Sequence, residues 1–306
     1  MNPMASAPGE SVRQRFAARW NDFFFAESPV YAAVYFRVFL AVWTAGFILP
    51  RLPHLRELYA ERALQVPHPW AERFGGLLTL PLEITWLVTI ALLVCLACFA
   101  AGYHARHLHP FIVLMLAYLL GYNLPRVHAY GQLAFYQWLV AYCLPYDRLC
   151  DRDGAVVRSP RWGLRIATML FSTVYLFSVL AKTVSGEGWL DGKALFYTMR
   201  SPDYGSFLLS AWVPISLGVA KVLGWGTLAN ETFVGLGLWH GRTRRWAMLA
   251  CFGMHLVMAL SMRVSVLFHL LMVGHLPLFF ADDTWQRIWP RGRRLSAFNG
   301  FRRSRP

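Results

Sequence analysis

Long apolar runs are the feature that most constrains what this chain can fold into. A helix needs about 20 consecutive apolar residues to cross the hydrocarbon core of a bilayer. Several runs approach that length, and the 306-residue sequence is 57% hydrophobic and only 15% charged. A soluble domain cannot bury that much apolar surface. We therefore predict an all-α fold, a polytopic transmembrane helix bundle.

Hydropathy predicts about eight spans, with seven or nine as the alternatives. The expected spans are residues 31–50, 77–101, 109–124, 128–146, 163–183, 222–241, 245–262 and 264–281. We expect the aromatic stretch 184–221 to form interfacial or re-entrant helices rather than a further span. The predicted organisation is a basic amphipathic cytoplasmic arm (1–30), one membrane domain (31–282) and a basic cytoplasmic tail (283–306).

Basic residues gather between the apolar runs and account for the formal net charge of +14. In a chain this hydrophobic, such a pattern is typical of topology signals and of contacts with anionic lipid headgroups, so no nucleic-acid partner is expected. An even number of spans places both termini on one face, and that face carries about twice as many Lys and Arg residues as the other. We predict a bacterial inner-membrane protein with both termini in the cytoplasm.

Six ionisable residues fall inside or at the ends of the predicted spans, where charge is costly and needs a reason. On the predicted topology all six lie at mid-depth or in the outer half of the membrane. They are Glu83, His128, Lys182, Glu231, His255 and His269. This convergence predicts a polar cavity open to the outside or to the outer leaflet.

Each of these residues also has a structural interpretation. Lys182 can be an anchor that reaches from a helix end to the interface. The histidines can be interfacial or buried packing residues. Glu231 is harder to explain without function, because a carboxyl in mid-span needs a cation or a proton. A pair with Lys182 and a pair with His255 both remain open.

Two cysteine and histidine motifs are weaker. Cys95 and Cys98 are spaced as a C-x-x-C pair, but they lie in a continuous apolar run, which favours small core residues. HARHLH at 104–109 is interpreted as a solvated basic loop. We therefore predict no metal site.

Three blocks of the sequence resemble a known family. They are RVHAYGQLAFYQWLVAYCLPYDR (126–148), YLFSVLAKTVSGEGWLDGKAL (175–195) and a closing block that begins at ETFVGLGLWHG (231–241). Together with the opening span they resemble the horizontally transferred transmembrane (HTTM) domain family, the membrane part shared with vitamin K-dependent gamma-glutamyl carboxylase. The resemblance runs over roughly residues 30–282.

The resemblance implies an activity and a set of site residues. In the carboxylase, a lysine deprotonates reduced vitamin K, and reaction of the quinol with oxygen drives carboxylation of a glutamate side chain. Lys182 matches that lysine. The matched blocks imply Lys182, His128 and His255 as catalytic residues and Tyr130, Tyr175 and Trp189 around a reduced quinone. The convergence of ionisable residues adds His269 to the quinone-binding residues, and Glu231 and Glu83 as supporting carboxylates. A secreted peptide is the implied second substrate.

The sequence departs from the carboxylase pattern at Ala181, where the carboxylase has a second lysine, and at Arg126 and Val127, where it has asparagines. The first hypothesis is therefore a quinol-dependent, carboxylase-like membrane enzyme that acts on a secreted peptide. The alternative is a non-catalytic membrane factor that binds or matures an exported peptide. A small-molecule carrier is disfavoured, because no inverted repeat is evident.

Overall fold

The computed structural model describes residues 11–59, 80–121, 129–151, 154–205 and 215–289. Within these ranges the chain is mostly helical, and a two-stranded antiparallel ribbon of β1 (Glu27–Pro29) and β2 (Arg158–Pro160) is its sheet. The all-α prediction is therefore confirmed. The helices are α1 (Val12–Phe25), α2 (Tyr31–Ile48), η1 (Leu49–His54), α3 (Leu55–Tyr59), α5 (Leu82–Ala101), α6 (Ala105–Gly121), α7 (Ala129–Ala141), α8 (Trp162–Val184), α9 (Lys193–Arg200), α11 (Leu217–Gly237), α12 (Arg244–Ser261), α13 (Val266–Gly274), η3 (Leu276–Phe279) and α14 (Asp282–Ile288).

Three stretches of helix in the described part are long and apolar enough to cross a membrane, at Tyr31–Tyr59, Leu82–Ala101 and Trp162–Val184. A fourth candidate is the helix pair Val266–Phe279 and Asp282–Ile288, which is bent by 109° at the break between its two parts. The remaining predicted spans coincide with helices that are shorter or less apolar, namely α6, α7, α11 and α12. The coarser prediction of a helix bundle with membrane-crossing candidates is thus confirmed.

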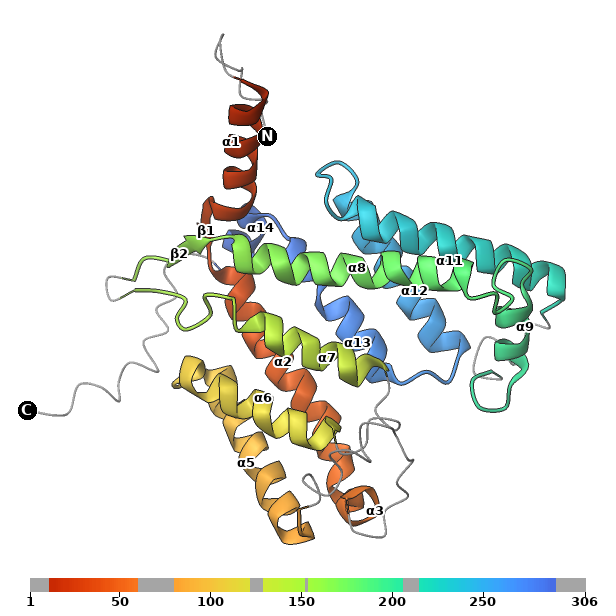
Figure 1. Cartoon of the computed structure of the whole chain (residues 1–306), viewed down its shortest axis with the longest axis horizontal. Helices are drawn as coiled ribbons and strands as arrows, with labels where there is room; N and C mark the ends of the chain where they lie inside the picture. The colour runs from red at the N-terminus through yellow and green to blue at the C-terminus, as the bar shows by residue number, and fades with distance from the viewer. Residues whose placement is uncertain (1–10, 60–79, 122–128, 152–153, 206–214, 290–306) are drawn as a thin grey trace, which may run out of the picture.

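The long helices follow one another in alternating directions, so their connections gather at two ends of the bundle (Figure 1). The β1–β2 ribbon, the α5–α6 turn and the α11–α12 turn lie at one end, together with α1. The α9 helix and the α12–α13 connection lie at the other end (Figure 1). The bundle therefore has one end that carries the start of α2 and one that carries the end of α8.

The helix α2 is central to the core. Most of its residues are buried, and it packs against α5, α7 and α13. Trp138 of α7 donates a hydrogen bond from its indole to Thr44 Oγ1 at 2.9 Å. Arg37 is buried and donates to the carbonyls of Tyr146 at 2.6 Å and Ala100 at 3.2 Å. Arg37 thus caps the end of α5 and ties three chain segments together at one end of the bundle.

The arm before α2 contains the helix α1, which starts with a capping box. Ser11 and Gln14 form a capping box, with the Gln14 backbone N–H donating to Ser11 Oγ and the Ser11 N–H donating to Gln14 Oε1. This reciprocal pair satisfies two of the free N–H groups at a helix start. At the other end of α1, Phe23 lies under the guanidinium of Arg165, 4.3 Å from its ring centroid. The arm is therefore attached to the start of α8.

Candidate functional site

The site is built on the contact between α8 and α11, which lie side by side along much of their length (Figure 1). Tyr175, Ser178 and Lys182 are three and four residues apart on α8, a spacing that places side chains on one face of a helix. A Cβ at Gly235 of α11 would come within 2.6 Å of the Leu176 side chain. The absence of a side chain at Gly235 therefore lets α8 approach closely.

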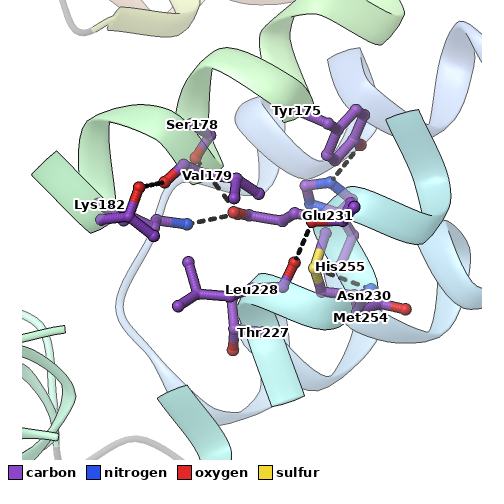
Figure 2. A network of polar contacts seen from close by, with 12 residues as sticks. Tyr175, Ser178, Val179, Lys182, Thr227, Leu228, Asn230, Glu231, Met254 and His255 are labelled. Atoms are coloured by element: carbon purple, nitrogen blue, oxygen red, sulfur yellow. Dashed lines mark hydrogen bonds and ion pairs between the residues drawn. The ribbon is translucent and has the colours of Figure 1, made fainter. Parts of the chain in front are cut away.

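Lys182 and Glu231 form an ion pair across this contact (Figure 2). The side chains are 18% and 9% exposed, respectively, so both charged groups are largely removed from solvent. Glu231 Oε1 also accepts a hydrogen bond from Ser178 Oγ at 3.3 Å. Glu231 Oε2 is buried and has no hydrogen-bond partner among the described residues. Glu231 Oε1 thus accepts both hydrogen bonds, and Oε2 has no partner among the described residues.

A turn after α8 folds back over the lysine. The Lys182 ammonium lies 4.6 Å from the centroid of the Trp189 ring, a cation–π geometry. Trp225 of α11 holds this turn by donating from its indole to the Leu190 carbonyl at 3.1 Å. Gly192 allows this turn to approach α11 closely, because its φ is +84° and a Cβ there would lie 2.5 Å from the backbone nitrogen of Lys221. Trp189 is therefore positioned by α11 as well as by its own turn.

The same turn carries an exposed ion pair between Asp191 and Lys193 at 2.8 Å. The hydrogen bond from Lys193 lowers the pKa of Asp191. Both side chains are about half exposed, so solvent screens their interaction. This exposed pair provides a matched comparison for the buried one.

A second group of polar side chains lies beside the ion pair. Tyr175 Oη is 2.9 Å from His255 Nε2 and 3.1 Å from Cys251 Sγ. His255 Nδ1 in turn is 3.1 Å from His269 Nδ1. All four residues are buried. Side chains of α8, α12 and α13 thus form one hydrogen-bonded chain, whose Tyr175–His255 link is visible next to Glu231 (Figure 2).

The structure brings together most of the site residues predicted from the sequence. Lys182 contacts both Glu231 and Trp189, and Tyr175, His255 and His269 form the adjacent hydrogen-bonded chain. Of the two partners left open for Glu231, the structure selects Lys182. His255 uses both ring nitrogens inside the chain, so it has none left for a ligand.

Three predicted residues are not part of this group. Tyr130 is buried, and its ring lies 6.4 Å from that of Phe268, the residue before His269. It is not a member of the hydrogen-bonded chain. Glu83 is exposed in the first turn of α5, which packs against α2, α3 and α6, apart from α8 and α11 (Figure 1). His128 lies outside the described residues.

Two residues in the group were not singled out from the sequence. Ser178 lies four residues before Lys182, and Cys251 lies four residues before His255. That spacing places each of them on the same helix face as its partner. The helical period was therefore the available signal, but serine and cysteine are common packing residues in apolar helices.

An open groove of about 570 Å³ lies on the face of α11 opposite Glu231. None of the ion-pair or histidine-chain residues lines it. Its lining residues are Ala229, Thr232, Phe233, Leu236, Gly237, His240 and Thr243. The described residues also hold no group of three or more His, Cys, Asp or Glu side chains that could bind a metal. The polar groups that the described part of the site offers are its amine, carboxylate, imidazoles and phenol.

Comparison with known proteins gives no significant match to a family model, a curated protein or a solved structure. The resemblance to the HTTM family thus stays a prediction from the sequence blocks.

Proposed function

We propose that the protein is a carboxylase-like integral membrane enzyme in which Lys182 takes a proton from the hydroxyl of a reduced quinone. In this proposal the eight helices α2, α5, α6, α7, α8, α11, α12 and α13 cross a bacterial inner membrane, with both termini in the cytoplasm. Lys182, at the end of α8, then lies near the outer face. The second substrate is a secreted peptide, and anionic lipids contact the basic end of the bundle.

The observation that carries the proposal is the largely buried Lys182–Glu231 pair. An ammonium beside a carboxylate holds the same protons as an amine beside a carboxylic acid. Low polarity penalises the charged form of such a pair, because both ions lose their hydration. In the proposed reaction Glu231 holds the shared proton, and Lys182 is the neutral amine that accepts a proton from the ligand.

The side chains around Lys182 suit a reduced quinone, which is an aromatic diol. Glu231 Oε2 is a buried acceptor that lacks a donor among the described residues, so it can accept a hydrogen bond from a ligand O–H. The Trp189 ring lies against the amine and offers an aromatic face. The ammonium formed on proton transfer would stabilise the adjacent ligand oxyanion. A bound quinol would supply reducing electrons, and one quinol plus one dioxygen balances one quinone epoxide plus one water.

The test is turnover of menadiol, a small reduced naphthoquinone, by protein in lipid nanodiscs. Lys182→Ala should lower the rate of epoxide formation at least about 100-fold, because a positioned base contributes that much or more. Lys193→Ala removes an exposed lysine of the same turn and should leave the rate unchanged. Retention of the wild-type rate in Lys182→Ala would remove the base assignment.

The alternative is a non-catalytic membrane factor for an exported peptide. The observation that favours it is that the Lys182 amine already has a carboxylate partner and an aromatic cover. Protein that turns over no quinol, but cross-links to an exported peptide through a photoreactive residue in the 185–192 turn, would support this alternative over the enzyme.

A further inference from the structure

The hydrogen-bonded chain Tyr175–His255–His269 ends at a ring nitrogen that has no partner among the described residues. His269 Nε2 is buried, and none of the described residues makes a hydrogen bond to it. The whole residue is 5% exposed. A buried ring nitrogen without a partner loses its bond to water and gains nothing in exchange. The described residues therefore leave this ring nitrogen in need of a hydrogen-bond partner.

The hydrogens of this hydrogen-bonded chain can be arranged in two ways, which differ in the direction in which its groups donate. Between His255 Nδ1 and His269 Nδ1, one nitrogen must carry the hydrogen and the other must accept it. If His269 Nδ1 is the donor, its Nε2 is an acceptor, and His255 Nε2–H donates to Tyr175 Oη. If His255 Nδ1 is the donor, Tyr175 O–H donates to His255 Nε2, and His269 Nε2–H is a donor. Both orders hold the same number of protons, and every group in them is neutral.

We propose that His269 Nε2 binds a ligand oxygen, and that the two orders of the chain fit the same oxygen as a hydroxyl or as a carbonyl. His255 is then a positioning residue whose tautomer changes together with that of His269. A hydroxyl would donate to Nε2 and select the first order. A carbonyl would accept from Nε2–H and select the second. The site thus accommodates a ligand whose oxygen alternates between these forms without placing a charge among buried side chains.

A quinol and its quinone are the ligand pair with this property, so the choice of ligand rests on the proposed function. The histidine tautomers do not depend on Lys182, however. Tyr175 contributes to the chain from the same helix face as Lys182, which places the chain beside the ion pair (Figure 2). The inference therefore assigns the ligand-contacting role to His269 rather than to His255.

The experiment is ¹⁵N NMR of protein in nanodiscs, labelled in the histidine rings. Protonated and unprotonated ring nitrogens give well-separated signals, and His269→Asn and His255→Asn assign them. With menadiol under nitrogen gas, His269 should be protonated at Nδ1. With menadione, the oxidised form, it should be protonated at Nε2. A tautomer that is the same with both ligands and without ligand would overturn the proposal, and would identify a fixed water or a packing role at Nε2.

A binding measurement provides the second readout. His269→Asn places an amide where Nδ1 lies and removes the position of Nε2, so it can keep the contact with His255. It should weaken menadiol binding about tenfold, the equivalent of one hydrogen bond. Unchanged affinity in a folded variant would contradict the proposal. Running both experiments in the Lys182→Ala background separates this inference from the base assignment, because a failed base leaves the tautomer shift intact.

Discussion

Replacing Lys182 by methionine tests how strongly the ion pair couples α8 to α11. Methionine keeps most of the length of the side chain and removes the charge, so Glu231 is left as a carboxylate that is only 9% exposed. Removing one partner of a buried pair typically costs about 3–5 kcal/mol, because the remaining charge is uncompensated. The lysine side chain is 18% exposed. We therefore expect the lower end, about 3 kcal/mol.

The matched variants give this number its meaning. Glu231→Gln keeps an acceptor for Ser178 and should cost less, about 1–2 kcal/mol. The double variant Lys182→Met/Glu231→Met leaves no buried charge and should fall within about 1 kcal/mol of the wild type. Lys193→Met breaks the exposed pair with Asp191 and should have no measurable effect.

The assay is reversible unfolding in mixed micelles, with rising dodecyl sulfate and helix content followed by far-UV circular dichroism. Two results would refute the reasoning. One is a Lys182→Met variant within about 1 kcal/mol of the wild type, below the range expected for a buried pair. The other is a double variant whose loss equals the sum of the losses of Lys182→Met and of a single Glu231→Met variant, because independent effects would show that the two residues do not interact.

Three further predictions address other parts of the molecule. Gly163→Ala should destabilise the protein by at least about 2 kcal/mol, because its Cβ would lie 2.2 Å from a backbone carbonyl oxygen. Gly226→Ala should be tolerated, because a Cβ there meets open space. Equal losses of stability in micelle unfolding would contradict this prediction. Trp189→Ala should cost about 1 kcal/mol in the wild type and much less beside Lys182→Met, and a full loss in both backgrounds would exclude the cation–π contact. Cys150 is exposed and should react with an impermeant maleimide in inside-out vesicles only. Labelling of Cys150 in right-side-out vesicles would contradict the proposed topology.

The helical segments were predictable because long apolar runs favour helices wherever a chain lacks water to satisfy its backbone. The face of α8 was also predictable, since Tyr175, Ser178 and Lys182 follow the helical period. The partner of Glu231 was not. Whether it meets Lys182 or His255 depends on how α11 is rotated against α8 and α12, and hydropathy carries no information about that rotation.

Long-range placements account for the rest of the site. Trp189 meets Lys182 because Gly192 adopts a left-handed conformation and lies against α11, which is a tertiary contact. The His255–His269 contact joins two helices whose connection reverses the chain. The sequence predicted that the ionisable residues lie at mid-depth or in the outer half of the membrane. It left open which histidine has a free nitrogen, because that depends on the contacts each ring makes.

The most direct test of the proposed function is the ionisation of bound menadiol. An ionised naphthol absorbs at longer wavelength than its neutral form, so a difference spectrum of menadiol bound to nanodisc-embedded protein under nitrogen gas reports whether its proton has moved. The account predicts the long-wavelength band in the wild type at a pH at which free menadiol is neutral, and its loss in Lys182→Met. A neutral spectrum in the wild type, or an equal band in both proteins, would contradict the assignment of Lys182 as the base.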